Sequence, residues 1–288
     1  WQSRAHQISG EGAVKGAGRN QIHMRMVSIA SGSSGNCIYI GSDDTHILVD
    51  AGISNKRIMA GLNDLGLAGT DMAGILITHE HSDHIRGLGV ISRKYHLPIY
   101  GTQKTLNEIS SCSSLGNFDK GLLKPIDPDV DFMVGDLKIR PFKIDHDAAD
   151  PVAYRVENGK KSVAVATDMG HYDEYIVENL KGLDAVLLES NHDVRMLETG
   201  PYPYHLKRRI LGDRGHLSNE NAGRLLNRIL HDHLKKIFLG HLSRENNYPE
   251  LAYETVRLEI DEGSCPYGAS DFSISVASRD QMSDVVYL

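Results

Sequence analysis

Few cysteines, no long apolar run and no positive net charge narrow the classes to which this chain can belong. Its three cysteines, Cys37, Cys112 and Cys265, lie far apart among 288 residues and form no Cys-x-x-Cys pair. This spacing argues against a disulfide scaffold or a zinc ribbon, so we expect a reduced, cytoplasmic setting. No apolar run reaches the roughly 18 residues that cross a bilayer, so we expect no membrane association.

The net charge and the first residues argue against two further features, a generally basic surface and a secretion signal. With neutral histidines the net charge is −7, so the surface as a whole does not predict nucleic-acid binding, although Lys207–Arg214 is locally basic. Residues 1–23 lack the layout of a secretion signal, are rich in glycine and end in a His-Met pair typical of a cloning junction. We interpret 1–23 as an expression tag and 24–288 as one α/β domain. Nothing in the sequence predicts an oligomeric state.

Short apolar runs alternate with helical stretches from residue 26 onward. We expect strands at 26–30, 37–40, 46–50, 74–78, 98–101, 137–144, 153–157, 162–167, 185–189, 237–239 and 272–277. We expect helices at 55–65, 85–95, 172–180, 204–211, 218–231 and 248–261. Such alternation predicts sheet layers with helices outside them, and no linker or repeat divides the domain.

Four potential metal ligands follow the buried strand at 74–78 within six residues. His79 and His81 alternate along extended backbone, so their side chains point the same way and can share one metal ion. If the chain then turns into a helix, Asp83 and His84 face a second ion. Imidazole and carboxylate groups suit Zn²⁺ and also accept Mn²⁺ or Fe. A polar loop rich in histidine by chance is the alternative interpretation.

Two complete metal sites need further donors, and later strand ends offer them. His146 follows one strand and is expected to complete the first site, while His241 follows the strand at 237–239 and is expected to complete the second. Asp168 also follows a strand, where its carboxylate could bridge two ions roughly 3.5–4 Å apart. His192 is the main rival to His146, and His171 is a weaker one.

This ordered series resembles the metallo-β-lactamase superfamily, whose pattern is His-x-His-x-Asp-His, then a lone His, a lone Asp and a late His. The Leu-Val-Asp-Ala-Gly segment that contains Asp50 looks like the superfamily's first motif, in which the aspartate supports the metal loop. The resemblance covers essentially all of 24–288. It implies an αββα sandwich, two mixed sheets flanked by helices, with two divalent metal ions at one edge between the sheets.

A narrower resemblance rests on four further segments. They are Ser31–Asn36, Glu189–Asp193, Gly215–Asn219 and His241–Asn247. These segments look like the YycJ/WalJ group of bacterial proteins. Membership of that group implies a cytoplasmic DNA exonuclease that acts in the 5′ to 3′ direction.

The chemistry expected at such a centre is hydrolysis by a hydroxide that bridges two metal ions and is a nucleophile near neutral pH. We expect Asp83, Asp168 and His216 to be the catalytic residues. His216 precedes a helical stretch and is our candidate proton donor to the leaving alkoxide. A structural hydrogen bond near a helix cap is its alternative role.

Substrate contacts are predicted for residues in two loops. They are Ser33, Ser34, Asn36, Ser243, Arg244 and Asn247. The Ser/Gly turn could present backbone N–H groups to a phosphate, or it could be a tight hairpin turn. Lys207–Arg214 could contact DNA phosphates, or it could be a solvated helix face. Asp50 and His192 are expected to orient metal ligands from behind.

Three functions remain open on sequence alone. The first is a metal-dependent phosphodiesterase, a DNA exonuclease, for which an open basic groove would be expected. The second is a small-molecule hydrolase that acts on a thioester, lactone or cyclic phosphodiester in a deep pocket. The third is a non-catalytic regulatory module, which would have a closed structural metal site.

Overall fold

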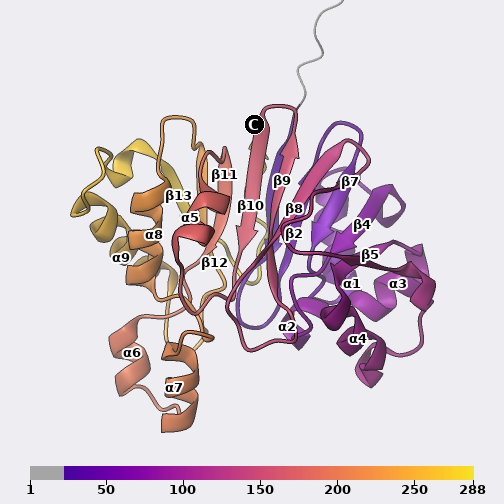
Figure 1. Ribbon diagram of the computed structural model, residues 1–288, viewed down its shortest axis with the longest axis horizontal. Coiled ribbons are helices and arrows are strands. Elements are labelled where there is room, and N and C mark those ends of the chain that lie inside the picture. Colours follow the sequence, from indigo (N-terminus) through magenta and orange to yellow (C-terminus); the bar gives the residue numbers. More distant parts are fainter. Residues whose placement is uncertain (1–22) are drawn as a thin grey trace, which may run out of the picture.

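Two mixed seven-stranded sheets pack face to face in the computed structural model, which describes residues 23–288 (Figure 1). The predicted expression tag lies outside the described residues except for its last residue, His23. In spatial order, the first sheet consists of β14 (Val286–Tyr287), β1 (Arg25–Ala30), β2 (Cys37–Gly41), β3 (His46–Val49), β4 (Met72–Leu76), β5 (Ile99–Thr102) and β6 (Leu123–Ile126). The second consists of β13 (Ser273–Val276), β12 (Lys236–Gly240), β11 (Ala185–Glu189), β10 (Lys161–Ala166), β9 (Val152–Asn158), β8 (Leu137–Lys143) and β7 (Phe132–Val134).

Parallel pairing places several strand ends at the same edge of each sheet. In the first sheet, β3, β4, β5 and β6 run parallel, whereas β14, β1, β2 and β3 pair antiparallel. In the second sheet, β10, β11, β12 and β13 run parallel. Side chains that follow these strands are therefore collected at one end of the sandwich.

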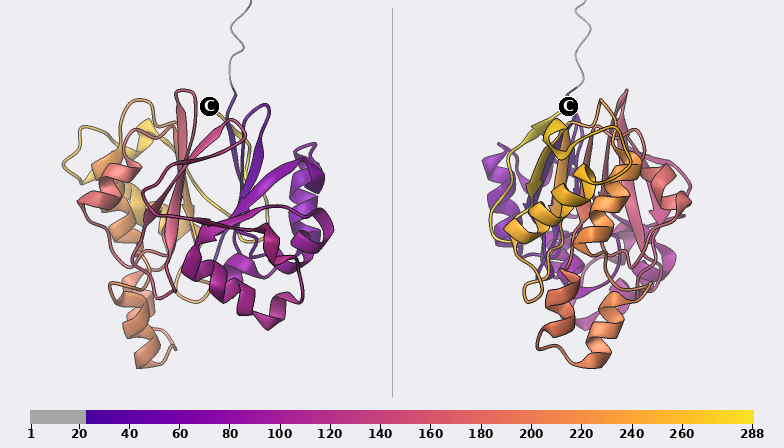
Figure 2. Two further views of the ribbon diagram at one scale, coloured as in Figure 1. Left: turned by 45° about the vertical axis from the view of Figure 1, so that its right-hand side comes forward. Right: turned by 90° about the vertical axis from the view of Figure 1, so that its left-hand side faces the viewer.

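Helices cover the outer faces of both sheets (Figures 1 and 2). The first sheet carries α1 (Asn55–Asp64), α3 (Leu88–Tyr95) and α4 (Gln103–Ser111), and the second carries α5 (Glu174–Leu180), α8 (Asn219–Ile229) and α9 (Pro249–Asp261). The helix α8 illustrates why these segments form helices that pack on a sheet. Ser218 caps its N-terminus, and apolar residues spaced three and four apart face the sheet. No helix of the described residues is long and apolar enough to cross a membrane.

Three hydrophobic clusters account for this layering. One lies between the sheets and contains Met26 and Ile40 of the first sheet together with Tyr154, Val165 and Phe238 of the second. The other two lie between each sheet and its own helices. Each strand that is buried on both faces must therefore be apolar on both faces, which explains the continuous apolar runs of the sequence. The predicted sandwich of two mixed sheets flanked by helices in one domain is confirmed.

Two short helices project beyond the end of the second sheet. They are α6 (Val194–Thr199) and α7 (Tyr204–Leu211), which stand clear of the sandwich in Figure 2. No residue of α7 is buried. We call this pair the helical arm. It lies at the same end of the molecule as α2 (Ser82–Ile85), the short helix that follows β4 (Figure 1).

The helix predicted near 85–95 is found as α3, which begins three residues later at Leu88, and the separate short helix α2 precedes it. A Cβ at Gly87 would lie 2.1 Å from the carbonyl oxygen of Ile53, while the Gly87 N–H donates to the carbonyl of Ala51 at 2.7 Å. The Gly87 N–H therefore bonds to a distant loop and not to a preceding helical turn, which separates α2 from α3. The elements α4, β6, β7, α6 and β14 were not predicted from the sequence pattern.

Candidate metal centre

Strand ends from both sheets deliver seven histidine and aspartate side chains to one edge of the sandwich. His79, His81, Asp83 and His84 follow β4, His146 follows β8, Asp168 follows β10, and His241 follows β12. Their donor atoms fall into overlapping groups, in each of which all atoms lie within 4.8 Å of one another. The structure therefore brings together all seven residues that the sequence predicts as metal ligands.

The first group contains His79, His81 and His146. The Nε2 atom of His146 lies 3.3 Å from Nδ1 of His81, and the ring centroids of His79 and His81 are 4.5 Å apart. Nε2 of His79 is buried and has no hydrogen-bond partner among the described residues. A buried ring nitrogen without a partner is costly unless it binds something, and a metal ion is the natural partner for three converging imidazoles.

The second group contains Asp83, His84 and His241. Oδ2 of Asp83 lies 3.3 Å from Nε2 of His241 and 3.5 Å from Nε2 of His84. The turn into α2 places residues 83 and 84 on helical backbone beside His79, whose ring centroid lies 4.1 Å from that of His84.

Asp168 lies between the two groups. Its Oδ2 is 3.3 Å from Nε2 of His84, and its Oδ1 is 3.5 Å from Nε2 of His241 and 3.7 Å from Nε2 of His146. The carboxylate is 1% exposed, and its Oδ2 has no hydrogen-bond partner among residues 23–288. The carboxylate of Asp168 therefore lies within reach of imidazoles from both groups, the position that a carboxylate shared by two ions would need.

Three of the residues at this centre have left-handed backbone conformations that non-glycine residues rarely adopt. The φ angles are 62° at Asp50, 62° at Asp168 and 57° at His241, each just after a strand. Such strain is retained where the surrounding structure fixes it, and it concentrates at functional sites. Here it turns each side chain back toward the metal centre directly at the strand end.

Asp50 supports the metal loop from behind. Its carboxylate accepts hydrogen bonds from the Thr78 backbone N–H at 2.9 Å and from the Thr78 hydroxyl, and it lies 2.7 Å from Nδ1 of His84. This contact fixes the tautomer of His84, so its Nε2 faces the metal centre. Gly52 allows the close approach of the same loop, because a Cβ there would lie 1.6 Å from the carbonyl oxygen of Asp83.

Glu189 is the residue that sequence reasoning missed as part of the site. It is fully buried at the end of β11, and its Oε1 lies 2.8 Å from Nδ1 of His241 and 2.9 Å from Nδ1 of His216. Its Oε2 accepts from the backbone N–H groups of Met169 and Leu217. The available signal was a glutamate that ends an otherwise wholly apolar strand.

Nearby charges shift the histidine pKa values in opposite directions. Burial lowers the pKa of His79 well below its ordinary value, and the neighbouring imidazole of His84 lowers it further. Burial would also lower the pKa values of His84 and His241, but carboxylates outweigh it, with Asp168 the largest contributor in both cases. The pKa of His84 is therefore well above normal, and that of His241 rises to about 10.

The raised pKa values of His84 and His241 reflect several buried carboxylates close to the two imidazoles. Asp50, Asp168 and Glu189 are at most 2% exposed, and Asp83 adds a fourth carboxylate. Without other cations, protons on the imidazoles balance this charge, and divalent metal ions would displace those protons on binding. The donor set of five imidazoles and two carboxylates fits Zn²⁺, Mn²⁺ or Fe, so these residues suit a site for two divalent ions.

Asn36 and Asn247, two of the predicted substrate-binding residues, are engaged within the fold. The side-chain amide of Asn36 bonds to the backbone of Gly32 and contacts Nε2 of His84 at 3.2 Å. That of Asn247 donates to the carbonyls of Ser190 and Asn191 and accepts from the Tyr248 N–H. Both side chains are buried. The structure therefore gives them a role in holding the loops, and not a free polar group for substrate.

Three of the four other predicted substrate residues are more accessible. Ser33, Ser34 and Arg244 are exposed, whereas Ser243 is buried and its hydroxyl accepts from the Asn246 N–H. His192, predicted to orient ligands, instead contacts Oδ1 of Asn191 through its Nδ1. The weaker rival ligand His171 lies 3.3 Å from Asp145, apart from the four metal groups.

The basic stretch that precedes His216 divides into two parts. Arg209 pairs with Asp147, and Arg214 donates to the carbonyl of His146 at 3.0 Å, so both attach the helical arm to a ligand loop. Lys207 donates to the carbonyl of Glu198 within the arm, and Arg208 remains exposed. Three of the four basic residues predicted to contact phosphate, Lys207, Arg209 and Arg214, are thus engaged in internal bonds.

A small hollow opens beside His216 at the base of the arm. Its volume is about 160 Å³, and Ser33, Tyr202, Arg209 and Ser243 are among the residues that line it. The His216 ring centroid is 5.1 Å from that of His146 and 5.3 Å from that of His241. The hollow therefore adjoins both metal groups.

Comparisons with known proteins agree with this geometry. A family described as the Beta-lactamase superfamily domain matches residues 45–237. The chain is 43% identical over 240 residues to Exodeoxyribonuclease YycJ of Bacillus anthracis, covering 81% of this chain and 88% of that protein. It is 39% identical over 261 residues to Exodeoxyribonuclease WalJ of Streptococcus pneumoniae, covering 91% and 97%. The crystal structure of the metallo-β-lactamase fold protein YhfI from Bacillus subtilis superposes with a TM-score of 0.66 at 18% identity, covering 93% of this chain and 100% of that one.

Proposed function

Since this chain belongs to the metallo-β-lactamase superfamily, within the group of the YycJ and WalJ exodeoxyribonucleases, we propose that it is a two-metal-dependent phosphodiesterase and a 5′→3′ DNA exonuclease. The observation that carries the proposal is the convergence of seven histidine and aspartate donors in a chain about 40% identical to proteins named exodeoxyribonucleases. The direction of digestion and the native metal, Zn²⁺ or Mn²⁺ with Fe as a third candidate, are parts of the proposal that rest on the family resemblance and the donor chemistry.

We assign one ion to each group of donors. His79, His81 and His146 would hold the first ion. Asp83, His84 and His241 would hold the second, and Asp168 would be shared. When bound, two such ions lower the pKa of a shared water, so that hydroxide forms near neutral pH, and they neutralise phosphate oxygens.

His216 is proposed to deliver the proton that the leaving alkoxide needs. Its Nδ1 bonds to Glu189, which leaves Nε2 facing outward, and a fifth of the side chain is exposed. Glu189 therefore fixes the tautomer of His216 and the orientation of His241 with the same oxygen. Asp83 and Asp168 complete the proposed catalytic set by holding the ions in place.

The surroundings of the centre favour a polymer over a small molecule. The hollow beside His216, at about 160 Å³, is smaller than the roughly 300–1,000 Å³ of typical small-molecule pockets. The helical arm beside it carries the exposed Arg208 and Tyr204, which is 75% exposed. These groups suit backbone phosphates and bases of a nucleic acid.

Digestion of end-labelled DNA tests the proposal. The chain, after metal analysis, is incubated with 5′-labelled and 3′-labelled oligonucleotides in single- and double-stranded form, with Zn²⁺, Mn²⁺ or Fe²⁺. Progressive loss from the 5′ end is expected, together with hydrolysis of bis-p-nitrophenyl phosphate. Asp83→Ala and Asp168→Ala should abolish both activities, whereas Asp64→Ala, at the exposed end of α1, should retain them.

Two results would count against the proposal. Metal-loaded protein that leaves both DNA and bis-p-nitrophenyl phosphate intact is not a phosphodiesterase. Turnover of a thioester or lactone without any nuclease activity would identify a small-molecule hydrolase instead.

A further inference from the structure

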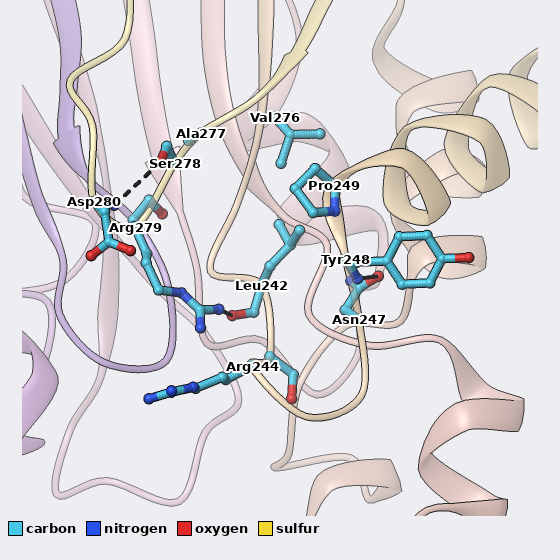
Figure 3. Close-up of a pocket in the computed structure, with 12 residues that line it drawn as sticks. Leu242, Arg244, Asn247, Tyr248, Pro249, Val276, Ala277, Ser278, Arg279 and Asp280 are labelled. Carbon is cyan, nitrogen blue, oxygen red and sulfur yellow. Dashed lines mark hydrogen bonds between the residues drawn. The ribbon is translucent and has the colours of Figure 1, made fainter.

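A second pocket shares Ser243 with the hollow beside His216. Its volume is about 320 Å³, and it is formed by the loop that follows His241 and by the segment 276–280 that follows β13 (Figure 3). Of the residues predicted from sequence to bind substrate, Ser243, Arg244 and Asn247 line it. The segment 276–280 has no part in the metal centre. This volume falls at the lower end of the range for ligand pockets.

Two arginines give the pocket its chemical character. Arg244 and Arg279 both line it, and their side chains extend on the same side of the pocket in Figure 3. Arg244 is exposed, with no ion-pair or hydrogen-bond partner for its guanidinium among the described residues. The carboxylate of Asp280 is also in the lining. Guanidinium groups recognise phosphate through paired N–H donors, so a surplus of them favours a phosphate ligand.

Internal bonds fix the position of Arg279. Its Nη2 donates to the carbonyl of Leu242 at 3.0 Å, while its own carbonyl accepts from Nη2 of Arg57 at 2.6 Å. A Cβ at Gly32 would lie 3.2 Å from Cβ of Arg279, so the Ser/Gly turn packs against it. Arg279 is thus held in place before any ligand arrives, and this reduces the entropy lost on binding.

The pocket is connected to the metal centre through two serines. Ser31 lines the pocket, and its hydroxyl accepts from the backbone N–H of the proposed ligand His241 at 2.9 Å. Ser243 lines both this pocket and the hollow beside His216. A chain bound at the metal centre can therefore continue from one depression into the other past Ser243.

We propose that this pocket is a backbone subsite for the DNA strand, in which Arg244 and Arg279 bind a phosphate of a nucleotide next to the one being cleaved. This inference rests on the proposed nuclease function and extends it. The strand then contacts both the helical arm, which lines the hollow beside His216, and the pocket. Contacts to phosphate predict binding without sequence preference and with marked salt dependence.

Binding of oligothymidylates of increasing length tests the subsite. Fluorescence anisotropy is measured with oligomers of two to ten nucleotides at several salt concentrations, using the Asp83→Ala protein so that the DNA stays intact. Arg244→Gln should weaken binding of the long oligomers by up to about fivefold and leave the dinucleotide unaffected. It should lower the slope of log affinity against log salt by about 0.7, the value for one contact on single-stranded DNA.

Two further variants control for charge and for side-chain shape. Arg257→Gln removes one positive charge from α9, where Arg257 pairs with Glu254 and Asp261, and should behave like the parent protein. Arg244→Lys keeps the charge and loses the planar fork, so its affinity should fall between those of the parent and Arg244→Gln. In the enzyme with Asp83 intact, Arg244→Gln should lower kcat/KM for the decamer by more than it lowers hydrolysis of bis-p-nitrophenyl phosphate, since the smaller substrate is too short to reach the pocket.

The inference is overturned if affinity and salt slope are unchanged by Arg244→Gln at every length. It is also overturned if the variant weakens binding of thymidine monophosphate as much as that of the decamer, since the pocket would then be a mononucleotide site. Both results leave the nuclease proposal standing, because that proposal is judged by digestion of DNA with the unaltered chain.

Discussion

Replacement of Gly52 by alanine should displace the metal loop without removing any ligand. The added Cβ would lie 1.6 Å from the carbonyl oxygen of Asp83, 2.3 Å from its carbonyl carbon and 2.8 Å from the Asn36 backbone nitrogen. All three are backbone atoms, so no side chain can move aside. The φ of Gly52 is not in the left-handed region, so the expected effect is steric alone.

The magnitude follows from the bonds that must break. Even the shortest Cβ contacts found in proteins are near 3.0 Å, so the Asp83 oxygen must move by at least about 1.4 Å. That movement strains three backbone hydrogen bonds of 2.8 Å: from Asn36 to Asp83, from Ala51 to His84 and from Gly52 to Asn36. At about 1 kcal/mol each, the loss is about 3 kcal/mol of stability, or roughly 6–12 °C in Tm. A displacement of this size at a ligand should also reduce kcat about 100-fold or more.

Thermal unfolding, metal content and hydrolysis of bis-p-nitrophenyl phosphate measure these effects together. Gly268→Ala is the matched control, because the nearest atom to its Cβ would be 3.5 Å away, an ordinary contact. If Gly52→Ala unfolds at the parent temperature, binds the same amount of metal and turns over normally, the contact between the first motif and the metal loop has been misassigned and the reasoning fails.

Four further outcomes are expected. Chelation of bound metal should lower Tm, and adding Zn²⁺ or Mn²⁺ should restore it, because a ligand at 1,000 times its Kd adds about 4 kcal/mol to the free energy of unfolding. An unchanged Tm would argue against a metal site. Glu189→Gln should reduce metal affinity or activity about 10- to 100-fold, measured by metal titration and kinetics, because an amide has one acceptor oxygen and cannot serve both the two imidazoles and the backbone N–H groups of Met169 and Leu217. Tyr154→Phe should cost about 1–3 kcal/mol in chemical unfolding, since its hydroxyl donates at 2.8 Å to a buried carbonyl just before the metal loop. Iodoacetamide should leave Cys37 unmodified in the native protein and label it after unfolding, as mass spectrometry can establish, because Cys37 is fully buried and burial raises the pKa of its thiol.

Strand ends made the donor residues of the centre predictable. His79, Asp168 and His241 each follow an apolar strand, and side chains at the ends of parallel strands meet at one edge of a sheet. The alternation of strand and helix patterns predicted sheet layers with helices outside them, while the sandwich of two mixed sheets was implied by the resemblance to the superfamily. A polar residue at the end of an apolar strand can be recognised from a few neighbouring residues. Its place at the edge of a sheet follows without knowledge of the tertiary contacts.

The features that the sequence pattern did not reveal depend on tertiary contacts. Gly87 interrupts a helical pattern because a distant carbonyl lies against it, which no local spacing can reveal. Asn36 has the chemistry of a substrate contact, yet its side-chain amide is hydrogen-bonded to the backbone of Gly32. Glu189 is hidden because a carboxylate at the end of an apolar strand resembles an ordinary strand boundary. Arg279 lies in a segment whose neighbours come from elsewhere in the chain.

The left-handed backbone at Asp50, Asp168 and His241 restricts how the metal centre can be re-engineered. Short polar residues such as Asn tolerate that conformation, whereas a β-branched replacement would be penalised before its donor atom was considered. A library aimed at a new metal preference should therefore vary His79, His81 and His146, whose backbones are outside this region, and keep Asp168 and His241 fixed. The ligand set thus divides into positions open to redesign and positions fixed by the path of the main chain.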